Sequence, residues 1–308
     1  MTEVPYSSPQ LAKANGIEIC YDTFGLPDAE PLLLIMGLSA QMVLWDDEFC
    51  QQLASRGFRV IRFDNRDIGH STKMSGGGGK RITVTEFLKL RFFGILPWAP
   101  YTLRDMADDT VGLMDALGIR TAHVVGASMG GAIAQEVAIH HPERVSSLTS
   151  IMSTTGNLRL PQPKREAMAL LMSPPPRTKD QYIATFARNW KILRAGRFPL
   201  DEAKDRERAE RCYARGLNPA GVARQFRAIL ASGARNKALA SVRAPSLVIH
   251  GAADPLVRPE AGVDTARSIP GAKLLMIEGM GHAMPIPLWP QIIDAIADHA
   301  HAATKQAA

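Results

Sequence analysis

Ser128 has the residue type and the surroundings of a nucleophile. It lies in the run Gly126-Ala127-Ser128-Met129-Gly130, between a short apolar stretch and a helical pattern. A Gly-x-Ser-x-Gly run between a strand and a helix is typical of a nucleophile elbow, a strained turn that exposes the serine hydroxyl. Because a serine hydroxyl is a weak nucleophile at neutral pH, it needs a base that takes its proton and a third group that orients the base.

Asp254 and His282 are our candidates for the acid and the base. Each directly follows an apolar run, at 245–251 and 273–279 respectively, and their order after the serine is the one expected downstream of such an elbow. Two alternatives remain open: Asp254 could cap the turn at Pro255, and His282 could be an ordinary loop histidine. His70, in the loop after 58–64, is the closest competitor, and we interpret it as a supporting or structural residue.

Two backbone NH groups are predicted to form an oxyanion hole for acyl transfer. One belongs to Met129, which follows the nucleophile, and the other to Leu38, which follows Gly37 after the apolar run 31–37. We also assign Gly37 and Trp190 to the substrate pocket. Trp190 ends a stripe of aromatic residues at four-residue spacing, which either packs inside a helical segment or also lines the pocket.

The elements that must position these residues form an α/β architecture. Continuously apolar runs indicate strands that are buried on both faces, and helical patterns separate several of them, which predicts a mostly parallel sheet flanked by helices. The predicted strands are 16–22, 31–37, 58–64, 122–126, 147–152, 245–251 and 273–279, and the predicted helices include 105–117, 132–140, 260–268 and 290–302.

The strand rhythm stops between 156 and 240, where helical patterns and proline-rich joints replace it. We therefore expect two units: an α/β core formed by 1–155 and 241–308, and an inserted helical cap formed by 156–240. The cap holds 18 Lys and Arg against 7 Asp and Glu, whereas the rest of the chain holds 18 against 23. This basic excess indicates either a solvated helical surface or attraction of an anionic substrate, partner or membrane.

A smaller insertion runs from 73 to 100. Its four glycines at 76–79 are expected to form a flexible connection. Thr83 and Glu86 have the spacing of a capping box, which predicts a helix over 83–94 with many apolar residues. This helix could be a lid at the substrate entrance, a membrane-surface helix or ordinary packing.

Composition excludes several classes of protein. With 308 residues, 46% hydrophobic and 21% charged, the chain is a folded protein rather than a disordered, collagen-like or coiled-coil one. It contains no apolar run long enough to span a bilayer and no secretory signal pattern in its first twenty residues, so we expect a cytoplasmic location and no membrane association. No nucleic-acid motif, metal site or disulfide framework is indicated, and the three cysteines are interpreted as structural.

Taken together, these motifs resemble the α/β-hydrolase superfamily over essentially the whole chain, and more closely the aclacinomycin methylesterase-like carboxylesterases. The shared features are the elbow, the DNRDIGHS loop (64–71), the YTLRDMADD segment (101–109), and the runs around Asp254 and His282. One departure is Met36, where many members have histidine. The resemblance implies ester hydrolysis without a cofactor.

The leading hypothesis is a serine carboxylesterase that hydrolyses small to medium apolar esters through an acyl-enzyme. Perhydrolases, lactonases and carbon–carbon bond hydrolases use the same serine arrangement and remain alternatives. Dehalogenases and epoxide hydrolases of this superfamily have aspartate at the elbow, and the complete triad argues against a non-catalytic binding protein. The sequence does not indicate the oligomeric state.

Overall fold

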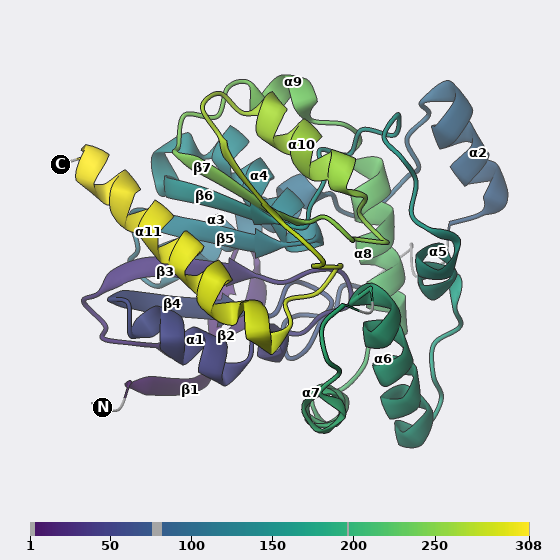
Figure 1. The fold of residues 1–308 in the computed structure, drawn as a ribbon, viewed down its shortest axis with the longest axis horizontal. Coiled ribbons are helices and arrows are strands. Elements are labelled where there is room, and N and C mark those ends of the chain that lie inside the picture. The colour runs from purple at the N-terminus through teal and green to yellow at the C-terminus, as the bar shows by residue number, and fades with distance from the viewer. Residues whose placement is uncertain (1–3, 76–81, 196, 308) are drawn as a thin grey trace.

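The computed structural model describes residues 4–75, 82–195 and 197–307, and in this part of the chain eight strands form one sheet (Figure 1). Their order is β1-β2-β4-β3-β5-β6-β7-β8. The first two pairs are antiparallel, and every pair from β4–β3 to β7–β8 is parallel, which confirms the predicted mostly parallel sheet. The strands are β1 (Tyr6–Ala14), β2 (Ile17–Phe24), β3 (Glu30–Ile35), β4 (Phe58–Phe63), β5 (Ala122–Ala127), β6 (Val145–Ile151), β7 (Ser246–Gly251) and β8 (Lys273–Ile277).

Every apolar run that we interpreted as a strand coincides with β2 to β8, but the sequence analysis missed β1. This strand lies at the edge of the sheet, and most of its residues are exposed or half-buried. A strand that buries so little apolar surface has no continuous apolar run, and this was the signal that the strand prediction used. β2 separates the missed strand from the parallel strands, whose carboxyl ends carry the candidate site residues.

Helices cover both faces of the sheet. The helices α1 and α11 pack on one face and α3, α4 and α10 on the other. The predicted helices at 105–117, 132–140, 260–268 and 290–302 correspond to α3, α4, α10 and α11. The bounds are α1 (Asp47–Ala54), α3 (Leu103–Ala116), α4 (Met129–His140), α9 (Asn236–Leu239), α10 (Pro259–Ser268) and α11 (Trp289–Ala307), with 3-10 turns at Met42–Leu44, Pro142–Arg144 and Ile286–Leu288.

A second group of helices lies beyond one end of the sheet (Figure 1). Four of them follow β6 and precede β7 in the chain: α5 (Arg165–Met172), α6 (Lys179–Leu193), α7 (Glu202–Ala214) and α8 (Pro219–Ala231). They fall within the segment 156–240, which we continue to call the cap, and its separation from the core remains our proposal. The fifth, α2 (Val84–Phe93), begins with the predicted capping box of Thr83 and Glu86. The glycine run 76–79 lies outside the described residues.

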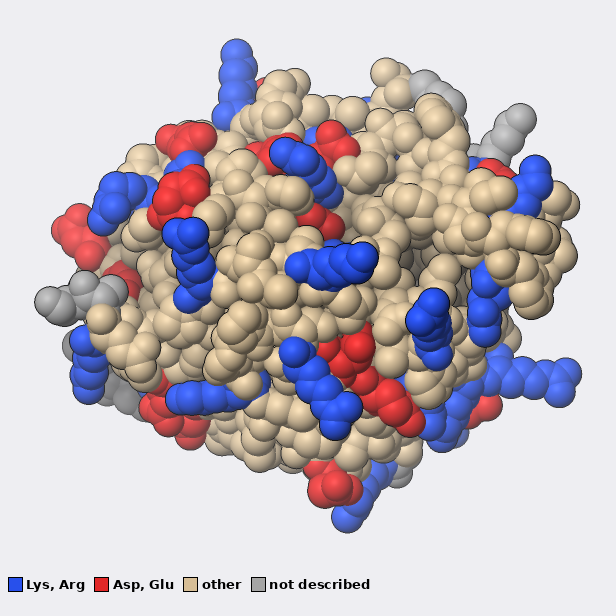
Figure 2. All heavy atoms as spheres, turned by 90° about the horizontal axis from the view of Figure 1, so that it is seen from above, with Lys and Arg blue, Asp and Glu red and all other residues tan. Residues whose placement is uncertain are grey.

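Part of the basic excess of the cap is paired with acids of the core. Basic residues of α7 and α8, or next to α7, form ion pairs with acids that belong to residues 46–67. We call these contacts the ionic seam. Its pairs are Lys204–Glu48, Arg208–Asp46, Arg211–Asp47, Arg215–Asp64 and Arg224–Asp67. Acidic and basic side chains also intermingle on the face of the molecule that Figure 2 shows.

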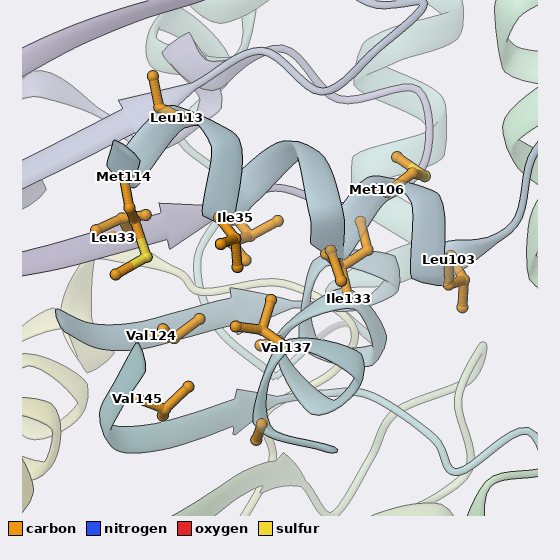
Figure 3. Close-up of a cluster of buried hydrophobic side chains, with 14 of the residues drawn as sticks. Leu33, Ile35, Leu103, Met106, Leu113, Met114, Val124, Ile133, Val137 and Val145 are labelled. Carbon is orange, nitrogen blue, oxygen red and sulfur yellow. The ribbon is translucent and has the colours of Figure 1, made fainter. Parts of the chain in front are cut away.

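The alternation of side chains along β3 connects the sheet to both helical layers. Leu33 and Ile35 point into the cluster with α3 and α4, which Figure 3 shows, whereas Leu32 and Leu34 point into the cluster with α1 and α11. All four are completely buried. Strands that are packed in this way on both faces are rigid, and they hold the beginnings of the loops at their carboxyl ends in fixed positions. No helix in the described part of the chain is long and apolar enough to cross a membrane.

Candidate active site

Ser128 occupies a strained turn between β5 and α4. Its backbone has φ 56° and ψ −120°, a conformation that residues other than glycine rarely adopt. A Cβ atom on Gly126 would lie 2.1 Å from the carbonyl oxygen of Gly130, and one on Gly130 would lie 2.1 Å from that of Ile35. Glycine is therefore required at both positions, as the elbow interpretation predicts. Strain of this kind persists only where the surrounding structure enforces it.

A continuous chain of hydrogen bonds joins the three candidate residues. The Oγ atom of Ser128 lies 2.9 Å from Nε2 of His282, and Nδ1 of His282 lies 2.7 Å from Oδ2 of Asp254. The serine comes from the end of β5, the aspartate from the loop after β7 and the histidine from the loop after β8. The three loops meet because the carboxyl ends of parallel strands lie at one edge of the sheet.

The carboxylate of Asp254 is buried and held by the backbone. Its Oδ1 accepts hydrogen bonds from the NH groups of Leu256 and Val257, both at 2.8 Å. These bonds include the turn-capping role that we considered as the alternative, and Oδ2 remains directed at His282. Both roles therefore belong to the same side chain: one oxygen fixes the carboxylate and the other orients the imidazole.

The backbone of His282 is held by the cap. Its NH donates a hydrogen bond to the carbonyl oxygen of Leu193, at the end of α6, over 2.7 Å. The neighbouring Gly281 permits this approach, because a Cβ atom there would lie 2.2 Å from the same oxygen. No residue pattern indicates this contact in advance, because its acceptor is a backbone carbonyl group.

The loop after β3 places Gly37 and Leu38 next to the serine. A Cβ atom on Gly37 would lie 3.1 Å from Cβ of Ser128 and 3.5 Å from its Oγ. Among the described residues, neither the NH of Leu38 nor that of Met129 has a protein acceptor. Two unpaired donors beside a nucleophile are what an oxyanion hole requires.

Two residues that the sequence analysis missed hold this loop in place. The side-chain amide of Asn65 donates to the carbonyl oxygen of Met36 over 2.9 Å, and the NH of Ser39 donates to Oε1 of Gln225 over 3.1 Å. Gln225 belongs to α8 and is completely buried. A buried glutamine in a helix has no recognisable motif, so only the folded structure reveals its partner.

The serine opens into a cavity of about 1080 Å³ between the sheet and the cap. Gly37, Leu38, Ser128, Met129 and His282 form part of its floor, and the aromatic stripe Tyr182, Phe186 and Trp190 of α6 forms part of its wall. Adjacent rings of the stripe lie 6.1 Å and 5.7 Å apart, so these residues both pack against one another and line the cavity. Most of the remaining lining residues are aliphatic.

Comparison with protein families identifies the architecture around this site. A model described as the alpha/beta hydrolase fold matches residues 30–287. The chain belongs to the α/β hydrolase fold family. The family match spans all three residues of the hydrogen-bonded chain, and the resemblance inferred from the motifs is confirmed.

Two curated relatives of this α/β hydrolase are named as methylesterases. Rhodomycin D methylesterase DauP of a Streptomyces species is 29% identical, and the alignment covers 96% of this chain and 99% of that protein. Rhodomycin D methylesterase DnrP of Streptomyces peucetius is also 29% identical, with 91% and 94% covered. Among solved structures, a meta-cleavage product hydrolase of Pseudomonas fluorescens superposes with a TM-score of 0.75, 20% identity, and coverage of 96% and 98%. An enol-lactonase of Burkholderia xenovorans superposes with a TM-score of 0.69 and 20% identity, and the superposition covers 94% of this chain and 99% of that protein.

Two motifs of this α/β hydrolase, the loop at 64–71 and the segment at 101–109, contact each other beneath the site. Arg66 forms an ion pair with Asp109 at 2.6 Å, and the hydroxyl of Tyr101 donates to Asp67 over 2.7 Å. Their side chains are almost completely buried. Since Arg66 and Asp67 follow β4, and Asp109 belongs to α3, these contacts join the loop after β4 to the beginning of α3.

His70 takes no part in the hydrogen-bonded chain of this α/β hydrolase. The residue is exposed, and its backbone NH donates to Asp64, but it does not line the cavity. The three cysteines are buried and are not linked as disulfides. No cluster of side chains suited to a metal ion occurs in the described ranges.

Proposed function

We propose that this protein is a serine carboxylesterase that hydrolyses small to medium apolar carboxylic esters. The observation that carries the proposal is the unbroken contact from Ser128 through His282 to Asp254, with the two unpaired backbone donors beside the serine. This arrangement suits a nucleophile, a general base and an orienting acid. The strained elbow supports the same assignment, because backbone strain at this half-buried serine gives the fold no stability and is typical of functional sites.

Acylation begins when the Ser128 oxygen attacks the ester carbonyl carbon. Nε2 of His282 takes the hydroxyl proton, and Asp254 stabilises the imidazolium through Nδ1. The carbonyl oxygen becomes an oxyanion, which accepts hydrogen bonds from the NH groups of Leu38 and Met129. When the tetrahedral intermediate collapses, the bond to the alcohol oxygen breaks, and His282 returns its proton to that oxygen.

Deacylation repeats these steps with water in place of the serine. His282 removes a proton from the water while the hydroxide attacks the acyl carbonyl, and the oxyanion again lies against Leu38 and Met129. Collapse of the second intermediate breaks the bond to Ser128, and His282 reprotonates the serine oxygen. The products are a carboxylic acid and an alcohol, and the enzyme returns to its starting state without a cofactor.

The cavity and the relatives support an ester with an apolar acid portion. Walls built mainly of aliphatic and aromatic side chains favour ligands that gain from the burial of apolar surface. At about 1080 Å³ the cavity is at the upper end of the range for small-molecule sites, so it has room for acids beyond simple short chains. The names of the methylesterase relatives support an ester with a small alcohol portion.

Lactone opening, peracid formation and carbon–carbon bond hydrolysis remain the alternative. The solved structures of a meta-cleavage product hydrolase and an enol-lactonase share the fold at 20% identity, so the names of these neighbours support carbon–carbon bond hydrolysis and lactone opening on this fold without favouring either for this chain. The distinction therefore depends on substrates rather than on the triad.

The decisive experiment measures hydrolysis of p-nitrophenyl esters of increasing acyl length by the wild type, Ser128→Ala and the control Ser241→Ala. We expect Ser128→Ala to lose at least about 10⁴-fold in kcat, because the nucleophile is gone. Ser241 is exposed and lies outside the cavity, so its variant should match the wild type. A fluorophosphonate should add once, at Ser128, as located by mass spectrometry. Retained activity in Ser128→Ala would contradict the mechanism, and an adduct without ester turnover would favour the alternative.

A further inference from the structure

A group of large apolar side chains is exposed on α2 and on the loop that follows it. Phe92, Phe93 and Trp98 are 70%, 77% and 64% exposed. Proteins that stay monomeric in water rarely leave so many large apolar groups together on the surface. We call this group the α2 patch, and it comprises Leu88, Phe92, Phe93, Ile95, Leu96 and Trp98.

The α2 patch is presented by an anchored element. Arg227 of α8 binds both carboxylate oxygens of Glu86, at 2.9 Å and 3.0 Å, and also donates to the carbonyl oxygen of Trp98 over 2.9 Å. On its inner side the helix places Phe87 and Leu90 in the wall of the cavity. One face of α2 therefore lines the cavity, and the opposite face displays apolar groups to the surroundings.

The charges around the α2 patch are of one sign. Between 82 and 100 the sequence contains a single acid, Glu86, and Arg227 neutralises it. Lys89 and Arg91 are exposed on the same helix, and the Arg91 guanidinium lies 5.9 Å from the ring centre of Phe92. Neither cation has an acidic partner in the part of the chain that the structure describes. Apolar and aromatic groups beside such cations match the boundary of an anionic bilayer, where rings enter the headgroup layer and cations meet phosphates.

A second copy of this chain fits the α2 patch less well. Closed symmetric contacts place the same surface on both partners. Lys89 and Arg91 of both copies would then enter one interface, to which the segment 82–100 contributes no acid other than the paired Glu86, and an excess of like charge opposes association. An anionic lipid surface satisfies both the apolar and the charged groups.

We propose that the α2 patch binds reversibly to the surface of membranes that contain anionic lipids. The contact is peripheral, because α2 is a ten-residue helix and the described chain has no spanning helix. It departs from the expectation of no membrane association and selects the membrane-surface interpretation of the helix at 83–94. The binding itself does not depend on the proposed esterase activity, but together they would place the cavity wall next to a lipid phase in which apolar esters concentrate.

The test is sedimentation of Ser128→Ala protein with phosphatidylcholine vesicles that contain or lack phosphatidylglycerol. Without hydrolysis, the measured quantity is binding alone. We expect binding to the anionic vesicles that weakens with added salt, and at least about tenfold weaker binding to neutral ones. Failure to sediment with anionic vesicles, or equal binding to both kinds, would overturn the proposal.

Substitutions then locate the contact. The triple variant Phe92→Ser/Phe93→Ser/Trp98→Ser should lose vesicle binding at least about tenfold, and Lys89→Gln/Arg91→Gln should lose the preference for anionic vesicles. The matched control is Leu11→Ser/Leu26→Ser, because these residues are 57% and 63% exposed but lie outside the patch. None of the substituted side chains lines the cavity, so thermal unfolding and hydrolysis of a soluble ester, measured with Ser128 intact, verify the fold.

Two results with these variants would reject the lipid contact even if the protein folds. One is unchanged vesicle binding in the triple variant. The other is a dimer in sedimentation velocity that the triple variant abolishes, without any vesicle binding by the parent, which would assign the α2 patch to self-association. If the wild type does not hydrolyse esters, the proposed function is wrong, but the result on membrane binding still stands.

Discussion

The two sides of the cavity differ in the kind of residues that they carry: one side is rich in ion pairs, and the other carries exposed apolar groups. On one side the ionic seam joins α7 and α8 to acids of the core through ion pairs, several of them buried. On the other side α2 presents large apolar groups to the surroundings and is connected to α8 through Glu86 and Arg227. The ionic seam holds the cap helices in one position on the core, because buried charges are stable only in a few arrangements. The α2 patch instead forms an exposed apolar surface.

The ionic seam also explains why the cap contains more basic than acidic residues. Its excess charge suggested either a solvated surface or an attractor of anions, but part of this charge is paired with the acidic residues of the core. The five seam pairs use cations of the cap and acids of residues 46–67. Opposite net charges in two segments of one chain therefore indicate that the segments pack against each other. The cations near the α2 patch remain available because Glu86 is already paired.

The most damaging way to break the seam is to remove Arg224. Asp67 is completely buried and accepts hydrogen bonds from both Arg224 and Tyr101, so Arg224→Met leaves a buried carboxylate without its cation. We expect a loss of about 3–5 kcal/mol in the free energy of unfolding, measured with urea. The control Arg206→Met removes an exposed pair with Glu210 and should cost less than about 1 kcal/mol. Equal small losses in both variants would show that the seam does not hold the cap.

The second variant tests whether the cap positions His282, the proposed general base. Arg194 ends α6 and binds Asp205 of α7, and the adjacent Leu193 carbonyl accepts the hydrogen bond from the His282 backbone. We expect Arg194→Met to lower kcat by about 10- to 100-fold with a smaller change in KM, because misplacement of a catalytic group mainly affects the chemical step.

Rescue distinguishes this positioning role from general damage. Arg194→Lys keeps the charge and should recover part of kcat, whereas Arg188→Met, at an exposed position of the same helix, should behave as the wild type. A fall in thermal stability with unchanged kcat would reject the link between α6 and His282.

Much of the site was predictable because it depends on local patterns. Ser128 has a five-residue signature, and Asp254 and His282 follow apolar strands, so their meeting at one sheet edge follows from parallel topology. The roles of Gln225 and Leu193 were not predictable. One acts through a buried amide and the other through a backbone carbonyl, and both reach the site from the cap, whose placement on the core is set by tertiary packing rather than by residue spacing.

A smaller effect tests the connection between the two flanks. The hydrogen bonds from Arg227 hold the pKa of Glu86 at about 2, well below its ordinary value. Since the folded-state pKa is lowered, the pair contributes stability above the unfolded-state value of about 4.3, and this contribution disappears as the pH falls toward 2. The pair is partly exposed, so Glu86→Gln should cost at most about 1 kcal/mol at pH 7. Urea unfolding at a series of pH values should show that difference shrinking between about pH 4 and pH 2; a difference that is unchanged at pH 2 would contradict the pairing.

The smallest expected effect is the most specific to the α2 patch. Phe92→Ser removes a ring that is already 70% exposed, so the free energy of unfolding should change by less than about 0.5 kcal/mol. For comparison, Phe186→Ser removes a buried ring of the aromatic stripe and should cost about 3 kcal/mol or more. Urea unfolding of both variants checks the contrast. A large loss from Phe92→Ser would mean that the α2 patch stabilises the fold. A negligible loss would show that the ring does not stabilise the fold, so that the vesicle experiment with the same ring removed measures membrane binding alone.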